Sequence, residues 1–226
     1  MSPGRLTWLL VLALSAPDAV AVAQTMVPAP NDARFTVKVR TFVDLRFTNV
    51  TRQRYDVSCG AAALGTLLKY FYGEDLGEQE IIDGILEFGD KEKIKKDGFS
   101  MLELKRYGER RGYVAKGYRI PDPSNLARLR VPVITLVNTR GYNHFVVLKG
   151  VRNGRVFVAD PAFGNISRPM AQFIEGWTNV ILVFLSPDRR GDNAFTLDPM
   201  LKAPVGDQRV LLDRGLFSIR PQAGEF

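Results

Sequence analysis

The spacing of apolar residues changes along the chain, and in the first half it has the period of helices. From Cys59 the segment CGAAALGTLLKYFYG has apolar residues at helical spacing and ends at Gly73. Two further helices are expected. One runs through EQEIIDGILEF with Asp75 as its N-cap, and the other starts with a capping box, SMLE at 100–103, and ends at Gly112.

Beyond Pro121 the apolar runs become short and are separated by turn residues, as in strands. Strands are expected at 132–138, 144–151, 154–160 and 179–186. The pair Asn153-Gly154 between two of these runs favours a type I′ hairpin turn. Helices followed by hairpin-linked strands predict an α+β fold, with N-terminal helices packed on a C-terminal antiparallel sheet.

The residues before the helical half have two further patterns. The segment ARFTVKVRTFVDLRFTNV at 33–50 alternates apolar and polar residues, which predicts a strand or hairpin added to the same sheet. The first residues, MSPGRLTWLLVLALSAPDAVAVAQ, combine Arg5, an apolar run and a small-residue site ending at Ala23, the layout of a secretory signal peptide. The apolar run is about half of the roughly 20 residues that a spanning helix needs.

We therefore expect cleavage near Ala23 and a periplasmic or secreted protein, the alternative being a signal retained as an anchor. No other segment is apolar enough to span a membrane, so no integral span is expected after cleavage. Four parts are predicted: a signal peptide over 1–23, an N-terminal extension with one or more strands over 24–47, a main domain over 48–186 and a tail over 187–226.

Composition argues against a nucleic-acid partner. The 31 Lys and Arg exceed the 24 Asp and Glu by enough for a formal net charge of +7, but the basic residues are dispersed among acidic neighbours. The cluster KEKIKK at 91–96 is typical of a solvated helix face, and no aromatic platform accompanies it. We expect no nucleic acid among the partners.

Cys59 is the only cysteine of the chain, so it cannot form an internal disulfide. Its position at the start of a predicted helix lowers a thiol pKa, because the helix N-terminus carries partial positive charge. Gly60 leaves the backbone open to close approach by a substrate. The only histidine, His144, begins a predicted strand, so an imidazole base for this thiol can come only from His144.

A third polar residue, Asp160, ends the next predicted strand. The turn at 152–154 brings the start of one strand beside the end of the other, so His144 and Asp160 are predicted neighbours. Taken singly, Cys59 fits a buried small hydrophobe, His144 a structural residue and Asp160 a strand end. Together they favour a Cys-His-Asp triad. A metal site is not expected, since paired Cys or His spacings are missing, and no cofactor is predicted.

Four motifs occur in order: QRYDVSCG at 53–60, GFSMLELKRYGERRGY at 98–113, HFVVL at 144–148, and Asp160-Pro161 with Gly164. Over about residues 48–186 the chain resembles the C39 family of papain-like cysteine peptidases. The resemblance implies that Cys59 is the nucleophile, that His144 is the general base and then acid, and that Asp160 orients the imidazole. It also implies that Gln53 donates to the oxyanion.

Two departures from that family stand out. Ser58 occupies a position where many members have an acidic residue, and the chain begins with a predicted signal peptide, whereas the best-known members are N-terminal domains of exporters. It resembles stand-alone exported members, some of which accompany secretion systems for bacteriocin-like peptides or surface amyloid fibres. The implied function is cleavage of an exported polypeptide at a Gly-Gly or small-residue site, with secretion-system components as partners.

Two alternatives to an endopeptidase stay open at this point. A peptidase-like module can bind a leader or secretion substrate without cutting it. The same triad can also serve an amidase or a transpeptidase, because water and amines attack the same thioester.

Overall fold

The computed structural model describes residues 24–28, 34–38, 41–139, 141–188, 191 and 195. The predicted signal peptide over 1–23 and most of the predicted tail lie outside these residues. The chain divides into two compact units, Met1–Phe42 and Val43–Phe226. In the first unit, β1 (Gln24–Pro28) and β2 (Arg34–Lys38) pair as an antiparallel hairpin.

The prediction that this N-terminal segment joins the main sheet is wrong. Strands β1 and β2 form a two-stranded sheet of their own, and the second half of the alternating segment is a short helix, α1 (Phe42–Arg46). Apolar residues at 42, 43, 45 and 47 fit a single helical turn as well as a strand, so periodicity cannot decide between them over so few residues. The end of α1 is held by Asn165, whose Nδ2 donates to the carbonyl oxygen of Arg46 at 3.0 Å.

The main sheet lies in the second unit and has six strands in the order β3-β8-β4-β5-β6-β7, with every neighbouring pair antiparallel. The four predicted runs correspond to β4, β5, β6 and β8. The prediction missed β3 and β7, which are the two edge strands; an edge strand buries less surface, so its sequence need not be strongly apolar. The bounds are β3 (Val114–Arg119), β4 (Val133–Thr139), β5 (Tyr142–Arg152), β6 (Arg155–Asp160), β7 (Gly164–Pro169) and β8 (Trp177–Leu185).

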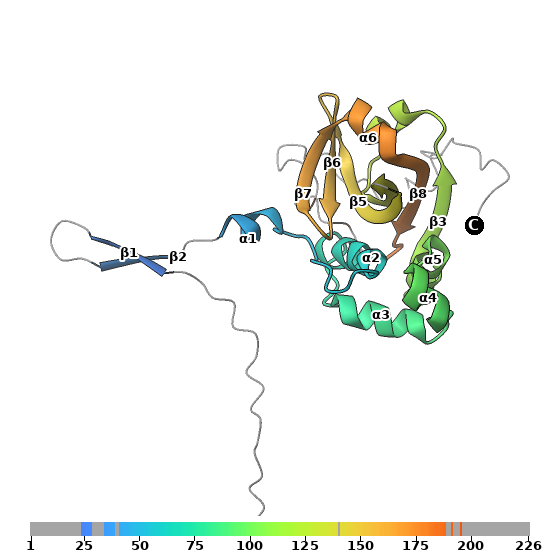
Figure 1. Ribbon diagram of the computed structural model, residues 1–226, viewed down its shortest axis with the longest axis horizontal. Helices are drawn as coiled ribbons and strands as arrows, with labels where there is room; N and C mark the ends of the chain where they lie inside the picture. Colours follow the sequence, from blue (N-terminus) through green and yellow to red (C-terminus); the bar gives the residue numbers. More distant parts are fainter. Residues whose placement is uncertain are drawn as a thin grey trace, which may run out of the picture. The chain divides into compact units, whose positions relative to one another are not determined.

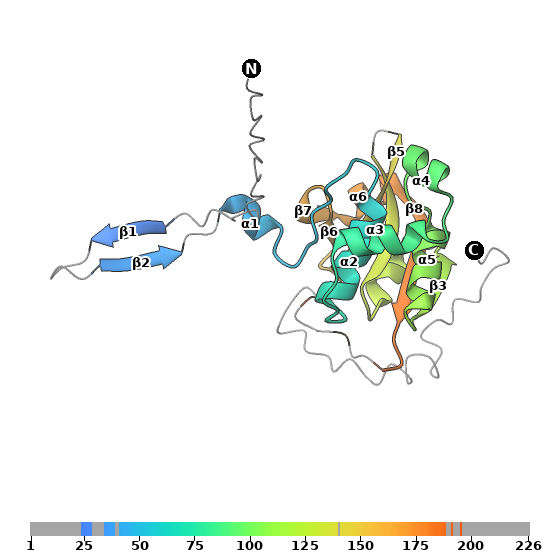
Figure 2. The same ribbon diagram turned by 90° about the horizontal axis from the view of Figure 1, so that it is seen from below.

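The helices confirm the predicted α+β class. Figure 1 shows α2 to α5 grouped on one side of the strands and α6 at the opposite end, and Figure 2 gives the view at right angles. The central helix α2 is buried at every residue from Cys59 to Leu68 and lies against β5. The bounds are α2 (Cys59–Tyr70), α3 (Glu78–Leu86), α4 (Lys91–Asp97), α5 (Met101–Arg110), the 3-10 helix η1 (Pro123–Arg128) and α6 (Met170–Gly176).

Of the two helix starts predicted from capping residues, one is confirmed and one is wrong. The capping box at Ser100 is present, with the Ser100 hydroxyl accepting from the Glu103 N–H and the Glu103 carboxylate accepting from the Ser100 N–H. Asp75 is not the cap of α3, which is Gly77. Asp75 pairs instead with Lys69 at the surface, 3.8 Å apart, because the helix begins too late for its carboxylate to reach the first turn.

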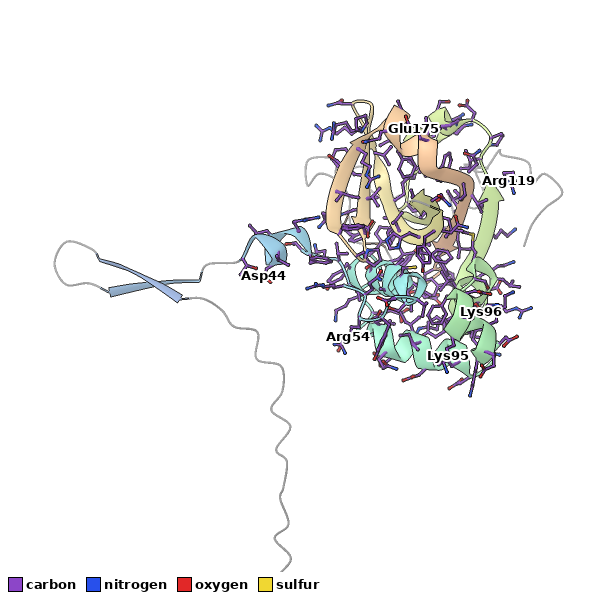
Figure 3. The ribbon with its side chains drawn as sticks, in the orientation of Figure 1. Asp44, Arg54, Lys95, Lys96, Arg119 and Glu175 are labelled. Atoms are coloured by element: carbon purple, nitrogen blue, oxygen red, sulfur yellow. The ribbon has the colours of Figure 1, made fainter. Side chains whose placement is uncertain are left out.

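The predicted turn between β5 and β6 is confirmed, since Asn153 and Gly154 both have positive φ, 49° and 70°, as a type I′ turn requires. The basic cluster lies on α4, where Ile94 is the buried residue. In Figure 3 the labelled side chains of Lys95 and Lys96 lie on the outside of this helix, in agreement with a solvated face.

The described part of the tail packs on the main domain. Phe195 is 1% exposed, and its ring centroid lies 6.3 Å from that of Phe71 at the end of α2. The ammonium of Lys149 lies 4.5 Å from the same Phe195 ring centroid. Phe195 therefore extends the core beyond the last strand. Among the described residues, no helix has the length and apolar character needed to cross a membrane.

Candidate active site

Cys59 is the first residue of α2, where the sequence predicted it. The first turn of α2 carries no acidic residue, so the positive end of the helix dipole is not neutralised beside the sulfur. The side chain is 3% exposed and sits at the junction of the helix with β5. This position favours the thiolate form of cysteine.

Ser58, the residue that departs from the family pattern, is buried and organises the turn before Cys59. Its hydroxyl donates to the carbonyl oxygen of Tyr55 at 2.8 Å and accepts from the Tyr55 N–H at 3.1 Å. It makes no capping hydrogen bond to α2. Ser58 therefore fixes the shape of the loop that leads into the nucleophile.

The expected role of Gly60 is wrong. A Cβ at this position would lie 3.1 Å from Cβ of Phe99 and 3.2 Å from Cδ2 of Phe145, so protein atoms already occupy the space. Gly60 allows α2 to pack closely on β5 and on the segment before α5. The glycine thus serves close packing, because a side chain at this position would crowd Phe99 and Phe145.

The hairpin β5–β6 brings His144 and Asp160 together. Nε2 of His144 lies 2.8 Å from Oδ1 of Asp160, and both side chains are buried, with 9% and 4% exposure. The same Oδ1 accepts the backbone N–H groups of Ala162 at 2.8 Å and Phe163 at 3.1 Å. The turn after β6 therefore holds the carboxylate, and the carboxylate holds the imidazole.

The pKa values of the thiol and the imidazole move in opposite directions. Burial alone would raise the pKa of Cys59, but hydrogen bonds from His144 and from the backbone of Phe145 outweigh burial and lower it. Burial acts to lower the pKa of His144, yet its hydrogen bonds to Asp160 and Cys59 raise it to about 9. The arrangement therefore favours a thiolate–imidazolium pair over a neutral thiol and a neutral imidazole.

Gln53 is placed at the edge of this site by its backbone, whose N–H donates to the carbonyl oxygen of Pro161 at 3.0 Å. Its side-chain Nε2 donates to the carbonyl oxygen of Tyr55 at 3.2 Å, while Oε1 is buried and has no hydrogen-bond partner among the residues that the structure describes. The amide is thus tied to the loop before Cys59. Its predicted role as an oxyanion donor stays a prediction.

Sequence reasoning did not select Tyr142, which also contacts the sulfur. Its hydroxyl lies 4.0 Å from Sγ of Cys59 and 3.5 Å from the carbonyl oxygen of Asp56. A signal was present, because Tyr142 stands two residues before His144 on β5, and a strand places such residues on the same face. Among the described residues, no group of three or more His, Cys, Asp or Glu side chains could hold a metal ion.

A cysteine that begins a central helix and faces a histidine on an antiparallel sheet is the arrangement of papain-like cysteine peptidases, and fold and site place the chain in this class. The chain belongs to the peptidase C39 family, whose model matches residues 48–189. It is therefore a cysteine peptidase. This identification rests on both the architecture and the sequence comparison.

Two relatives are similar over much of the chain. A "Probable functional amyloid protease FapD" of Pseudomonas fluorescens is 37% identical over 195 residues, which cover 86% of this chain and 85% of the relative. The protein of the same name from Pseudomonas aeruginosa is 41% identical over 148 residues, covering 66% of this chain and 65% of the relative.

A solved structure supports the fold assignment. It is a double glycine motif protease from an AMS/PCAT transporter in complex with the leader peptide, with a TM-score of 0.51 and 28% identity. The match covers 62% of this chain and 90% of that protein.

Proposed function

We propose that this protein cuts an exported polypeptide through a thioester on Cys59. The observation that carries the proposal is the 2.8 Å contact between His144 and Asp160 beside Cys59 at the start of α2, supported by the opposite pKa shifts of Cys59 and His144. The Cys59 thiolate attacks the scissile carbonyl carbon. His144 protonates the leaving amine as the C–N bond breaks, so a thioester and a neutral imidazole remain.

Water then attacks the thioester while His144 removes its proton. The C–S bond breaks, the carboxylic product leaves, and the thiolate and imidazolium are restored. Asp160 keeps Nε2 of the imidazole occupied, which leaves Nδ1 as the ring nitrogen available to exchange a proton with the sulfur. Asp160 thus acts as the positioning residue for His144.

Gln53 is the proposed side-chain donor to the oxyanion. The backbone carbonyl oxygen of Tyr55 accepts a hydrogen bond from the Ser58 hydroxyl as well as from Gln53. This carbonyl oxygen therefore keeps a hydrogen bond if the Gln53 amide turns toward a substrate. Backbone N–H groups at the start of α2 supply the second donor. Replacing Gln53 by Ala should then slow cleavage by about a hundred- to a thousand-fold.

For the substrate we propose a segment with a Gly-Gly or other small-residue site in a polypeptide exported to the periplasm or beyond. The relatives named as amyloid proteases favour a substrate of a fibre secretion system, and the structure solved with a leader peptide favours a double-glycine site. The signal-like N-terminus over 1–23 supports a periplasmic or secreted location.

The test uses paired synthetic peptides that differ only at one step, Gly-Gly in one and Val-Val in the other, with products identified by mass spectrometry. The wild-type protein should cut the first peptide and spare the second. Cys59→Ala and His144→Ala should each lower the rate by about six orders of magnitude.

Cleavage by Cys59→Ala at the wild-type rate would contradict the proposed mechanism. Tight retention of the peptide without any product, together with slow alkylation of Cys59, would instead identify a binding module. An amine acceptor added to the reaction separates hydrolysis from transpeptidation, because the transpeptidase product carries the mass of that amine.

A further inference from the structure

The proposed nucleophile is almost entirely covered. Cys59 is 3% exposed, yet a thiolate that attacks a peptide must come within bonding distance of a carbonyl carbon. One of the groups around the sulfur must therefore move when the substrate arrives. Most of these groups are fixed, because His144 and Phe145 are buried in β5, with 9% and 4% exposure.

Tyr142 differs from these neighbours. Its side chain is 46% exposed although its hydroxyl reaches to 4.0 Å from Sγ of Cys59. The second polar contact, to the carbonyl oxygen of Asp56, is 3.5 Å long. Both contacts are at the outer limit of hydrogen bonding, so neither anchors the phenol firmly.

The backbone explains how Tyr142 reaches the sulfur. Tyr142 is the first residue of β5 and follows Gly141, whose φ of 87° belongs to a turn. It lies two positions before His144, so both side chains leave the same face of the strand. The phenol thus extends from the sheet toward the loop before α2, with its hydroxyl near Sγ of Cys59.

We propose that Tyr142 is a side-chain gate over the nucleophile. In the free protein its ring shields Cys59 and its hydroxyl donates to the thiolate, and substrate entry rotates the ring outward. The inference rests on the proposed role of Cys59 as nucleophile and assigns the residue that controls access to it. The gate admits an extended, narrow peptide segment more readily than a bulky one.

The protonation of Tyr142 is consistent with a donor. Burial and the neighbouring Cys59 raise the pKa of the phenol to about 12, so the hydroxyl keeps its proton at neutral pH. Donation to sulfur also stabilises the thiolate, and Tyr142 is among the groups that lower the pKa of Cys59. The charged groups that face it are Cys59 and Asp56.

The test measures the rate of Cys59 alkylation by two reagents in the full chain, small iodoacetamide and bulky fluorescein maleimide. Tyr142→Ala removes the ring and should raise the maleimide rate about five- to tenfold relative to the iodoacetamide rate, since a weak contact sets the open fraction. Tyr142→Phe keeps the ring and loses the donor. It should raise the ratio of rates less than Tyr142→Ala does, because the ring remains, and it should move the pH midpoint of iodoacetamide alkylation upward.

Tyr55→Ala is the matched control, because Tyr55 is 53% exposed and its hydroxyl contacts Gln79 rather than the sulfur. It should leave both the ratio and the midpoint at wild-type values. An unchanged ratio in Tyr142→Ala overturns the gate, and an unchanged midpoint in Tyr142→Phe overturns the hydrogen bond to the thiolate. Neither result bears on the peptidase mechanism, which is tested separately by peptide cleavage in the wild type and in Cys59→Ala.

Discussion

Nε2 of His144 lies 2.8 Å from Oδ1 of Asp160, at facing ends of two strands joined by a tight hairpin. The two residues are 16 positions apart in the sequence, so their contact depends on the register of β5 against β6. This register includes an irregularity between Leu148 and Gly150, which shifts the pairing beyond it. The site is therefore built by the hairpin as a unit.

Replacing Asp160 by Asn should shift the alkaline limit of activity. The amide oxygen can still accept from His144 and from the turn, but the negative charge that helps to raise the pKa of His144 to about 9 is gone. The imidazolium then loses its proton at lower pH, so the alkaline fall in peptidase rate should move below pH 9. Rates measured against pH for wild type and Asp160→Asn test this, and coincident alkaline limbs would contradict it.

His144→Ala should make the thiol less reactive at neutral pH. Burial of Cys59 remains, while the hydrogen bond and charge that lower its pKa are lost, so the pKa rises. The wild-type Cys59 thiol should have its alkylation midpoint below pH 9, and the variant should require a higher pH. The pH midpoint of alkylation is the measurement. Equal midpoints would show that His144 does not stabilise the thiolate.

The stability of the fold should depend on pH differently with and without the thiol. The raised pKa of His144 contributes stability that is complete below pH 6.5 and is lost as pH rises through about 9. The lowered pKa of Cys59 has the opposite sign, because its contribution is complete above pH 9 and is lost as pH falls through the folded value. In the wild type these contributions oppose each other across this range.

Cys59→Ala should therefore lose stability as pH rises above 6.5, while the wild type changes less. Urea unfolding at several pH values measures both slopes. A steeper decline in the wild type than in Cys59→Ala would contradict the coupling between the two groups.

Glu74→Ala should destabilise the protein by about 1 to 2 kcal/mol, a loss reduced by the 38% exposure of the Arg111 side chain, which stays solvated without its partner. Glu74 is 8% exposed and accepts hydrogen bonds from Arg111 and from the hydroxyl of Tyr113, linking the end of α2 to the end of α5. Removing it leaves the Arg111 charge without this partner. Asp75→Ala is the control, since its surface pair with Lys69 should contribute less than about 1 kcal/mol. Equal losses in the two variants would contradict the structural role of Glu74.

Phe195→Ala should also destabilise the domain, by about 3 kcal/mol, because it opens a cavity beside Phe71. Phe163 is 52% exposed, so Phe163→Ala should have a small effect on the free energy of unfolding. A chain ending at residue 188 should lose as much free energy of unfolding as Phe195→Ala loses. If Phe195→Ala and the shortened chain both unfold like the wild type, the tail contributes nothing to the core.

Much of this protein is determined by local sequence. Helical spacing from Cys59, the capping box at Ser100 and the turn at Asn153-Gly154 each act over a few residues, so they can be recognised without the fold. A single cysteine and a single histidine also restricted the choice of nucleophile and imidazole base. The order of the motifs was sufficient to recognise the family to which the chain belongs.

Tertiary structure decided what local patterns cannot encode. The residues at 42–46 became a helix and the N-terminal strands paired with each other, because a short alternating segment does not specify its partner. Gly60 packs closely against Phe99 and Phe145. The hydroxyl of Tyr142 lies near the sulfur of Cys59, although the two residues are 83 positions apart in the sequence. Sequence alone fixes which groups are available for chemistry, whereas burial and distance, which set their pKa values and access, arise only when remote segments pack together.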